Sequence, residues 1–437
     1  MFKRFFIFSF LIFVLFSCGT DYFYSSFYIR KDLQWPLSPS EQADLNHRQQ
    51  IVGNYNFNQY TSPAIVATPD NHILVIYENR TTQNGDVIGI DGNKIININY
   101  AMSKNASSFS DVNKNIGGVA IGEGNSRGAP IAFVNRKSEI VVLAIAGTGF
   151  GGSSKTPSKI SISISTNSGY LWSDWEDLPQ ETFSKLSNEN YDRYYTNPGN
   201  GTVLRNGTLA CIIDFKKASS ANAEGFAIFY STDDGKTWQV GSTVKYTTSH
   251  RFARIITERN DGKLLIAAVA NTGNDYNNNG ALAWYLADSL NGNINSFSAS
   301  GLPNNSGGSV SGGIIRFDES GISKEGIILL HSIPNREYVG PNGAKEYVKN
   351  AAAISISEDN GANWKTVTNI LGKYDSYVRS STFRQSLIVL KDGTMAAAFE
   401  EGKAASINNN GYENFVLAYR RFSLEDISGG KYKYNGI

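Results

Sequence analysis

Cysteine, histidine and unbalanced charge are scarce in this sequence, and each shortage argues against a class of protein. Only two of the 437 residues are cysteines, and the four histidines (His47, His72, His250 and His331) show no paired spacing. A zinc centre is therefore not expected. The formal net charge is +1, and no run of lysine and arginine of the kind that binds nucleic acid occurs. We expect no metal, no other cofactor and no nucleic-acid partner.

The first residues predict export and a lipid anchor. Lys3 and Arg4 precede an apolar run from Phe5 to Phe16, which is too short to span a bilayer. The run ends in Leu15-Phe16-Ser17-Cys18-Gly19, which resembles the cleavage box of bacterial lipoproteins, although Phe16 is bulkier than usual there. We predict a signal peptide over 1–17, a lipid on Cys18 and a tether over 18–55. The alternative is an ordinary secretory signal that is cleaved nearby.

The anchor has two consequences. Gly19 is not the aspartate that signals retention at the inner membrane of enteric bacteria, so we expect the outer membrane or the cell surface of a bacterium. Cys211 is the one other cysteine, and it cannot form an internal disulfide once Cys18 is acylated. The fold must then be held by its hydrophobic core alone.

The body of the chain predicts an all-β fold. Short apolar, β-rich runs alternate with turns that are rich in glycine, asparagine, aspartate and serine, and helical periodicity is nearly absent. Asn-Gly and Asp-Gly pairs supply the positive φ angles of tight hairpins. Examples of the runs are 73–77, 140–145, 264–267 and 327–330, and the pairs lie at 91–92, 206–207, 261–262 and 392–393.

A repeated motif sets the architecture. The pattern Ser-x-Asp-x-Gly-x-x-Trp occurs at 231–238 and 357–364, and 165–172 repeats it with asparagine in place of aspartate. The first residues lie 66 and 126 positions apart, which indicates a period of about 63 residues. A worn copy lies at 103–109, and 288–295 holds no clear copy. Six such units fill residues 56–430, and four strands per unit give a six-bladed β-propeller.

The motif resembles the aspartate box of sialidases, a structural turn that lies away from the active site. We expect its side chains to hold a hairpin: Ser165, Asn167, Gly169, Trp172, Ser231, Asp233, Gly235, Trp238, Ser357, Asp359, Gly361 and Trp364. Further segments resemble sialidase blades, namely 60–65, 74–80, 195–201, 255–265, 386–394 with 399–400, and 418–424. The resemblance implies a sialidase-like propeller with exo-α-sialidase activity on sialylated glycans of a host.

The resemblance also assigns roles, and the chain fills them incompletely. Asp86, six residues after Arg80, matches the aspartate that protonates the leaving group, with Asp91 as a second candidate in the same loop. A solvated turn aspartate is the alternative. The other family positions hold different residues: Thr61 and Ala268-Val269 replace two arginines, Lys349 replaces the third, Ala253 replaces the glutamate, and Arg384 replaces the nucleophilic tyrosine.

Two explanations remain open at this point. Nearby groups could fill the roles from shifted positions, and the candidates are Arg127, Arg251, Arg254, Arg379, Tyr374 and Tyr377. Alternatively, catalysis has been lost, and the protein is a glycan-binding surface lipoprotein, an adhesin descended from a sialidase. In either case Arg80, Arg254, Lys349 and Arg384 would make a cationic cup for an anionic sugar. For each arginine alone, a solvated surface role is the alternative.

Overall fold

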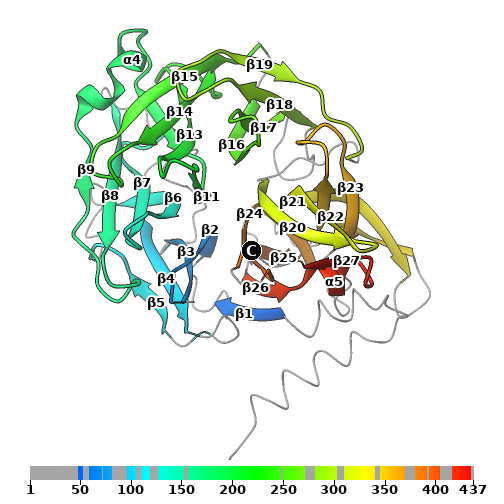
Figure 1. Ribbon diagram of the computed structural model, residues 1–437. Helices are drawn as coiled ribbons and strands as arrows, with labels where there is room; N and C mark the ends of the chain where they lie inside the picture. The colour runs from blue at the N-terminus through cyan, green and yellow to red at the C-terminus, as the bar shows by residue number, and fades with distance from the viewer. Residues whose placement is uncertain are drawn as a thin grey trace, which may run out of the picture.

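The computed structural model describes the chain over 48–52, 59–70, 72–80, 96–104, 109, 111–118, 126–151, 156–247, 250–270, 281–302, 310–339, 345–369, 379–390, 393–403 and 416–434. Six sheets, antiparallel except for one short parallel pair in the second, stand around a central axis like the blades of a propeller (Figure 1). The six-bladed propeller predicted from the 63-residue period is therefore confirmed. Among the described residues, no helix is long and apolar enough to cross a membrane.

The first three blades follow one another along the chain. Blade one holds β2 (Gln59–Ala67), β3 (Ile73–Arg80), β4 (Ile96–Ser103) and β5 (Asp111–Asn115). Blade two holds β6 (Arg127–Val134), β7 (Ile140–Gly147), β8 (Ser158–Ser165) and β9 (Glu176–Asp177), and β11 (Gly199–Asn200) pairs in parallel with β6. Blade three holds β10 (Arg193–Thr196), β12 (Thr202–Val203), β13 (Leu209–Lys216), β14 (Gly225–Ser231) and β15 (Gln239–Lys245). The short helices η2 (Gln180–Phe183) and α4 (Ser184–Ser187) join blades two and three.

The last three blades continue the ring. Blade four holds β16 (His250–Glu258), β17 (Leu264–Ala270), β18 (Leu282–Ala287) and β19 (Ile294–Phe297). Blade five holds β20 (Ser311–Glu319), β21 (Ile322–Val339), β22 (Lys345–Ser357) and β23 (Lys365–Asn369). Blade six holds β24 (Arg379–Val389), β25 (Met395–Lys403) and β26 (Val416–Phe422). The chain ends with α5 (Leu424–Ile427) and β27 (Tyr432–Tyr434), which pairs with β20.

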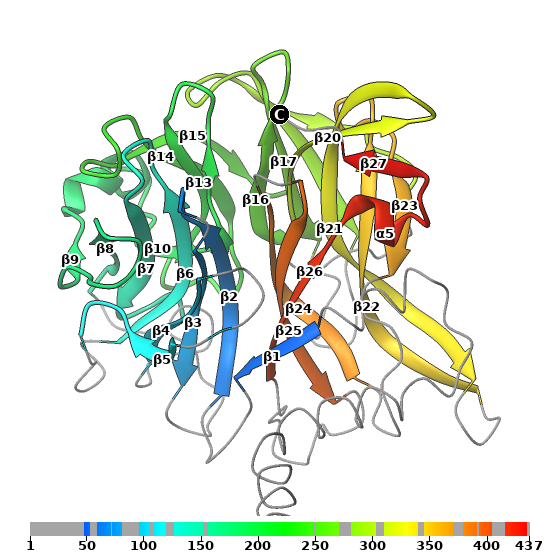
Figure 2. The same ribbon diagram turned by 60° about the horizontal axis from the view of Figure 1, so that its bottom comes forward.

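The ring is closed by a strand from the other end of the chain. β1 (Arg48–Val52) pairs antiparallel with β26 and is the outer strand of blade six, as the side view also shows (Figure 2). The sequence predicted a tether up to residue 55 and a propeller that begins at 56. The pairing of β1 corrects this boundary, because its backbone hydrogen bonds make it part of the last blade.

The core lies between the blades. The middle strands are buried on both faces because each sheet packs against two neighbours, and this explains their nearly continuous apolar sequences. β7 and β13 are examples, with every residue buried except the last of β7. One cluster joins Ile76 of blade one to Val142 of blade two, and another joins Ile212 of blade three to Ile266 of blade four.

The three Ser-x-Asp/Asn-x-Gly-x-x-Trp turns share the hydrogen bonds accepted by their serine and by their aspartate or asparagine, whereas the ring N–H of Trp364 in blade five has no partner among the described residues. In blade three, Asp233 accepts the backbone N–H of Thr237 at 2.9 Å, and Ser231 Oγ accepts that of Gly235 at 2.9 Å. Gly235 has a φ of 98°, and the buried Trp238 donates its ring N–H to the carbonyl of Gly235. Asn167 and Asp359 make the equivalent bonds in blades two and five. These residues therefore build turns.

The two ends of the propeller differ. In blade two, Ser165 pairs with Ile140, which pairs with Val134 at the end of the inner strand β6, whereas Arg127 at its start pairs with Ala146. The three turns thus lie at the end where inner strands finish. We call this end the box face, and the opposite end, where inner strands begin, the cup face.

Candidate functional site

Three of the arginines predicted from the sequence come together near the cup face. Arg80 ends β3 in blade one, Arg254 lies in β16 of blade four, and Arg384 lies in β24 of blade six. Their charges act on the same buried tyrosine, Tyr195 of β10, and Arg384 also acts on Arg254. The second strand of blade one and the inner strands of blades four and six therefore bring cations that are distant in the sequence near one tyrosine.

Arg254 is a buried cation without a carboxylate partner among the described residues. Its side chain is held by Nη1, which donates to the carbonyls of Val310 at 3.1 Å and Gln385 at 3.2 Å. Its Nε and Nη2 have no hydrogen-bond partner in the described part of the chain. Burial lowers the pKa of Arg254 to about 9, so it is still positively charged at neutral pH. A buried charge in this state is costly unless an anion joins it.

The backbone beside Arg254 is shaped for its guanidinium. Gly199 has a φ of 144°, and a Cβ built on it would lie 2.4 Å from Arg254 Nη1. A side chain at position 199 would therefore displace the guanidinium. The sequence had indicated only that 195–201 is a glycine segment before a strand, and the structure shows what its first glycine does.

Arg384 of blade six reaches the inner strand of blade one. Its Nη1 donates to Thr61 Oγ1 and Ser62 Oγ, both at 3.0 Å, and lies 3.9 Å from Glu400 Oε1. The resemblance to sialidases puts an arginine at position 61, where this chain has threonine. A cation is therefore present beside Thr61, supplied by the position at which sialidases have their tyrosine.

Tyr195 is the tyrosine that the structure places among these arginines. Its ring contacts Phe150 and Phe252, with centroids 5.5 and 6.2 Å away, and its hydroxyl has no hydrogen-bond partner among the described residues. Burial raises its pKa to about 12, and the arginines oppose this only in part. The phenol is therefore neutral at physiological pH, which is the weaker form of a nucleophile.

Three buried acids near the cup face each hold the next blade. Glu78 of blade one accepts the backbone N–H of Ala129 in blade two at 2.6 Å, and Asp214 of blade three accepts that of Phe252 in blade four at 3.0 Å. Glu400 of blade six accepts the N–H of Ser62 in blade one at 2.6 Å. We call this contact the blade latch.

Each latched residue sits at a β-bulge in an inner strand. Ser62, Ala129 and Phe252 have φ angles of 58°, 49° and 53°, an unfavourable conformation for residues other than glycine. The bulge turns the backbone N–H out of the sheet ladder, and the neighbouring carboxylate satisfies it. These acids are therefore committed to structural hydrogen bonds.

The charge of Glu78 is stabilised by its surroundings. Burial alone would raise its pKa, but the positive charges of Arg80 and Arg384 and the hydrogen bonds from Ala129 and Arg80 outweigh it. Arg80 Nε donates to Glu78 Oε2 at 2.9 Å. The pKa of Glu78 is thus below its usual range, so Glu78 is an anion at neutral pH and not a general acid.

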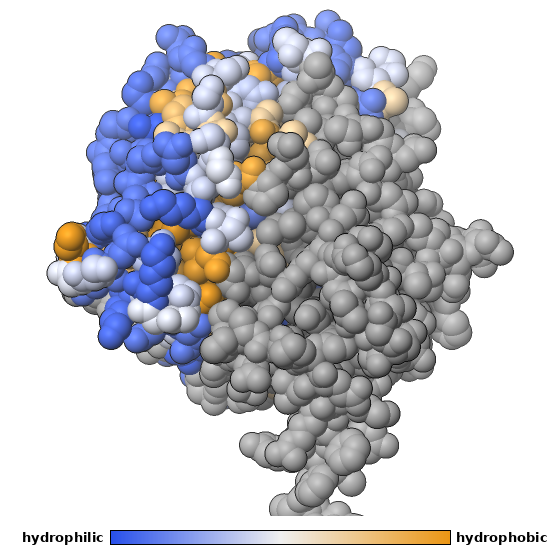
Figure 3. Space-filling model, turned by 90° about the vertical axis from the view of Figure 1, so that its right-hand side faces the viewer, coloured by the Kyte–Doolittle hydropathy of each residue, from blue (hydrophilic) through white to orange (hydrophobic). Residues whose placement is uncertain are grey.

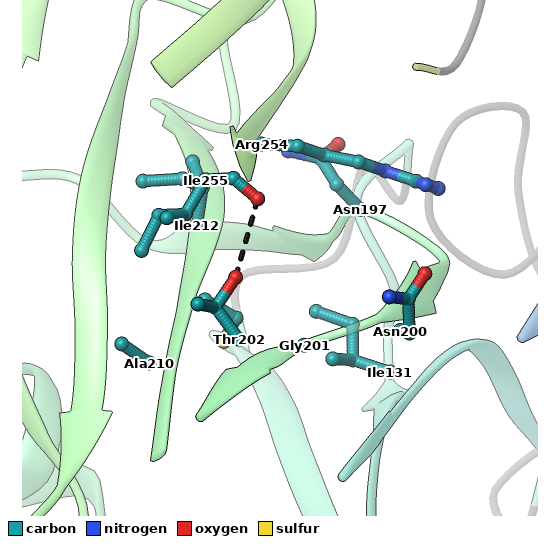
Figure 4. A pocket seen from close by; sticks show the side chains of 10 residues that line it. Ile131, Asn197, Asn200, Gly201, Thr202, Ala210, Ile212, Arg254 and Ile255 are labelled. Carbon is teal, nitrogen blue, oxygen red and sulfur yellow. Dashed lines mark hydrogen bonds between the residues drawn. The ribbon is translucent and has the colours of Figure 1, made fainter. Parts of the chain in front are cut away.

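Asn200 closes the axis below the arginines. Its Oδ1 accepts from Ser386 Oγ at 2.6 Å and Ser311 Oγ at 2.8 Å, and its backbone N–H donates to Ser386 Oγ at 3.1 Å. This network joins blade two to blades five and six. A small pocket lies beside it, between blades two, three and four, with Arg254, Asn197 and Asn200 at one end (Figure 4). In the same view Thr202 Oγ1 donates to the carbonyl of Ile255 at 3.3 Å.

Other predicted site residues cannot be placed. Asp86, Asp91, Tyr374, Tyr377 and Cys18 lie outside the described residues, as does the side chain of Lys349, whose backbone is in β22. Arg127 lies apart from the arginines of the cup and pairs with Asp177 at 3.3 Å. Among the described residues, no group of three or more histidine, cysteine, aspartate or glutamate side chains is arranged to hold a metal.

Sequence reasoning missed Tyr195, Glu78, Glu400 and Asn200. Each lies in a segment that resembles a sialidase blade, but none was assigned a role. The signal in the sequence was a carboxylate that follows an apolar strand run, as in Tyr77-Glu78 and Phe399-Glu400. Carboxylates in that position are buried and need a partner.

The comparisons with known proteins address the fold. No family model matches the sequence, and no curated protein matches it significantly. Among solved structures, the intramolecular trans-sialidase from Ruminococcus gnavus, in complex with oseltamivir carboxylate, superposes with a TM-score of 0.61 and 14% identity, over 88% of this chain and 99% of that one. The propeller has the sialidase fold.

Two other structures agree. NanB sialidase from Streptococcus pneumoniae gives a TM-score of 0.61 and 14% identity, over 86% of this chain and 70% of that one. The Hadza microbial sialidase Hz136 gives 0.58 and 17%, over 84% of this chain and 66% of that one. This chain thus spans about two thirds of the length of Hz136. At such low identity the likeness concerns the fold alone. The low identity agrees with the different residues that this chain has at the arginine and tyrosine positions of the sialidase pattern.

Proposed function

We propose that the cup of this protein binds the carboxylate of a terminal sialic acid on a glycan. The observation that supports this is Arg254, a buried guanidinium on the axis with two nitrogen atoms that lack partners among the described residues. A planar fork of donors matches a carboxylate, and the site gains a charge partner that the described residues do not supply. Arg384 and Arg80 add positive charge beside it.

Recognition is better supported than hydrolysis. A sialidase needs an activated tyrosine and a proton donor. At the position of the family tyrosine this chain has Arg384, which is hydrogen-bonded to Thr61 and Ser62. The described acids Glu78 and Glu400 accept structural hydrogen bonds. The best-supported function is therefore that of a glycan-binding protein with the fold of a sialidase.

Hydrolysis is the second candidate, and one observation favours it. The hydroxyl of Tyr195 lies among the arginines and has no partner in the described part of the chain. In this reading the Tyr195 oxygen, which loses its phenolic proton to water, forms a bond to the anomeric carbon while Asp86 protonates the departing glycan oxygen. A water molecule deprotonated by Asp86 then breaks the bond between the sugar and Tyr195, whose oxygen is protonated again. The product would be free sialic acid.

Binding is tested with a matched pair of ligands and a matched pair of variants. The exported chain without residues 1–17 is titrated calorimetrically with sialyllactose and with lactose, which lacks the carboxylate. We expect binding of sialyllactose only. Arg254→Gln should weaken it at least about tenfold, because a charge-assisted hydrogen bond is lost. The control is Arg205→Gln, an exposed arginine on the box face, with affinity unchanged within about twofold. Equal affinity for lactose, or an unaffected Arg254→Gln, would contradict the proposal.

Hydrolysis is tested with a fluorogenic sialoside. Release that is lost in both Asp86→Ala and Tyr195→Phe identifies a hydrolase that uses these residues. Binding without release identifies a glycan-binding protein. If Arg384→Ala/Lys349→Ala also abolishes binding, the cationic cup extends to blades five and six.

For the location we propose a bacterial cell envelope, with the chain anchored by a lipid on Cys18. The support is the cleavage box at 15–19 and the apolar run before it. Mass spectrometry of the N-terminal peptide from bacterial membranes tests this directly, because acylation adds the mass of the lipid to Cys18. A protein that fractionates identically after Cys18→Ser would contradict the anchor.

A further inference from the structure

The chain enters the propeller at the box face. In β1, Arg48 pairs with Arg420 and Val52 pairs with Leu417. β26 begins with Val416, which pairs with Glu401 next to the latch residue Glu400, so its first residues lie toward the cup face. β1 runs antiparallel to β26 and therefore begins at the box face. Arg48, the first residue that the structure describes, is thus at the end opposite to the cup.

The exposed apolar side chains of the described residues also lie on the box face. Four large hydrophobic residues are exposed: Leu171 by 73%, Ile322 by 62%, Tyr170 by 46% and Val203 by 41%. Tyr170 and Leu171 belong to the box turn of blade two, Val203 pairs with Leu209 at the start of β13, and Ile322 follows the turn after β20. Inner strands finish at this end, so all four residues lie there. From the side, the described surface is mainly hydrophilic, with apolar residues in small groups (Figure 3).

We propose that the box face rests on the membrane surface that carries the lipid of Cys18, with the cup turned away from it. The proposal rests on the predicted lipidation and is independent of whether the cup hydrolyses its ligand. Twenty-nine residues lie between Cys18 and Arg48. A linker of that length that behaves as a random coil would span roughly 30 Å on average, which would hold the face at which the chain enters close to the bilayer.

The chemistry of the exposed residues fits the bilayer interface. Leu171 and Ile322 come from blades two and five, on opposite sides of the axis, so a flat surface can contact both. Tyr170 has an apolar ring and a polar tip, as residues at the edge of a bilayer commonly do, and Lys104 lies over the ring at 5.4 Å. Tethering raises the local concentration of such a surface, so contacts that are weak in solution become populated.

Site-specific fluorescence tests this arrangement. The acylated full-length protein is purified from bacterial membranes, reconstituted in liposomes and labelled at a single introduced cysteine with an environment-sensitive dye. Cys211 does not compete for the dye, because it is buried and burial raises the pKa of its thiol. Leu171→Cys and Ile322→Cys report on the box face. The matched control is Asn222→Cys, exposed in the turn between β13 and β14 on the cup face.

Lipids with a spin-labelled headgroup should quench the dye at 171 and 322 at least about twofold more than at 222. Equal quenching at all three positions, stronger quenching at 222, or none anywhere would overturn the proposal. If the dye at 171 and 322 is instead shielded from the quencher, and more so at higher protein density in the bilayer, a second copy of this chain covers the box face. That result would also overturn the proposal.

A second arm separates failure of the anchor from failure of the contact. The chain from residue 19 onward, with a histidine tag in place of Cys18, is bound to nickel-chelating lipids and measured in the same way. If the native protein is not acylated, the anchor prediction is wrong, and this arm alone decides whether the box face contacts a bilayer. A pattern that favours 171 and 322 in this arm supports the contact, and a flat pattern contradicts it.

Discussion

Replacing Glu400 tests whether the blade latch closes the ring. Its carboxylate accepts from Thr61 Oγ1, from Ser62 N at 2.6 Å, and lies 3.9 Å from Arg384 Nη1. Glu400→Ala leaves the buried N–H of Ser62 without an acceptor, which costs about 1–3 kcal/mol. It also removes the acid from a buried ion pair, which costs about 3–5 kcal/mol when the other charge is left alone. Arg384 keeps its bonds to Thr61 and Ser62, so we expect a total of about 3–4 kcal/mol.

Glu400→Gln separates the effect of the charge of Glu400 on stability from the effect of its hydrogen bonds. Glu400→Gln keeps an oxygen that accepts from Ser62 and Thr61, so we expect a loss of only about 1–2 kcal/mol. Unfolding in urea, followed by tryptophan fluorescence, measures both variants, and an unchanged slope shows that the same surface is exposed. The control is Glu176→Ala, an exposed acid in β9. A cost for Glu400→Ala within about 0.5 kcal/mol of this control would refute the latch as a source of stability.

Three further predictions concern stability. The pKa of Glu78 is lower in the folded protein than in the unfolded chain, so ionised Glu78 stabilises the fold above the unfolded value near 4.5, and this stability is lost as the pH falls through the lower folded value. Below pH 4.5, Glu78→Gln should therefore lose less free energy of unfolding than the wild type. An equal loss in both proteins would contradict this. Burial lowers the pKa of His331 to about 4 from 6.5, so the unfolded chain binds the proton first and stability should fall as the pH drops from 7 to 4. In His331→Gln the urea midpoint should depend less on pH over that range than in the wild type. The same pH dependence in both proteins would count against this prediction. Asp233→Asn should lower the free energy of unfolding by well under about 1 kcal/mol, because Asn167 accepts the same hydrogen bond in blade two. Asp233→Ala should lower it by about 1–2 kcal/mol. Equal urea midpoints for the two variants would argue against a role of Asp233 in the turn.

The fold could be predicted because short sequence motifs that repeat along the chain determine its turns. The box turns need a side-chain acceptor, a glycine with positive φ and an aromatic residue at fixed spacing. The distance in sequence from one such turn to the next therefore gives the number of residues in a blade. The closing strand could not be predicted in the same way. β1 joins β26 through backbone hydrogen bonds, and its sequence, Arg48-Gln49-Gln50-Ile51-Val52, has no strong β pattern. Its place is decided by the open edge of blade six.

The site was predictable only in part, because its geometry depends on which side chains cross between blades. The sequence predicted a cationic cup, and the charges of Arg80, Arg254 and Arg384 act on the buried Tyr195. Comparing aligned positions could not show that Arg384 reaches Thr61, since the two residues are 323 positions apart and on different blades. It also gave no role to Tyr195, whose setting is created by Phe150 and Phe252 from other blades.

The buried acids and Arg254 contribute to the ring in different ways. Glu78, Asp214 and Glu400 each accept the backbone N–H of a strained bulge in the next blade, so their loss acts first on the ring. Arg254 of blade four donates to the carbonyls of Val310, next to blade five, and of Gln385 in blade six, so its loss removes a buried charge together with two hydrogen bonds between blades. The ring is therefore held by its own latches, while Arg254 carries a buried charge that has no carboxylate partner among the described residues.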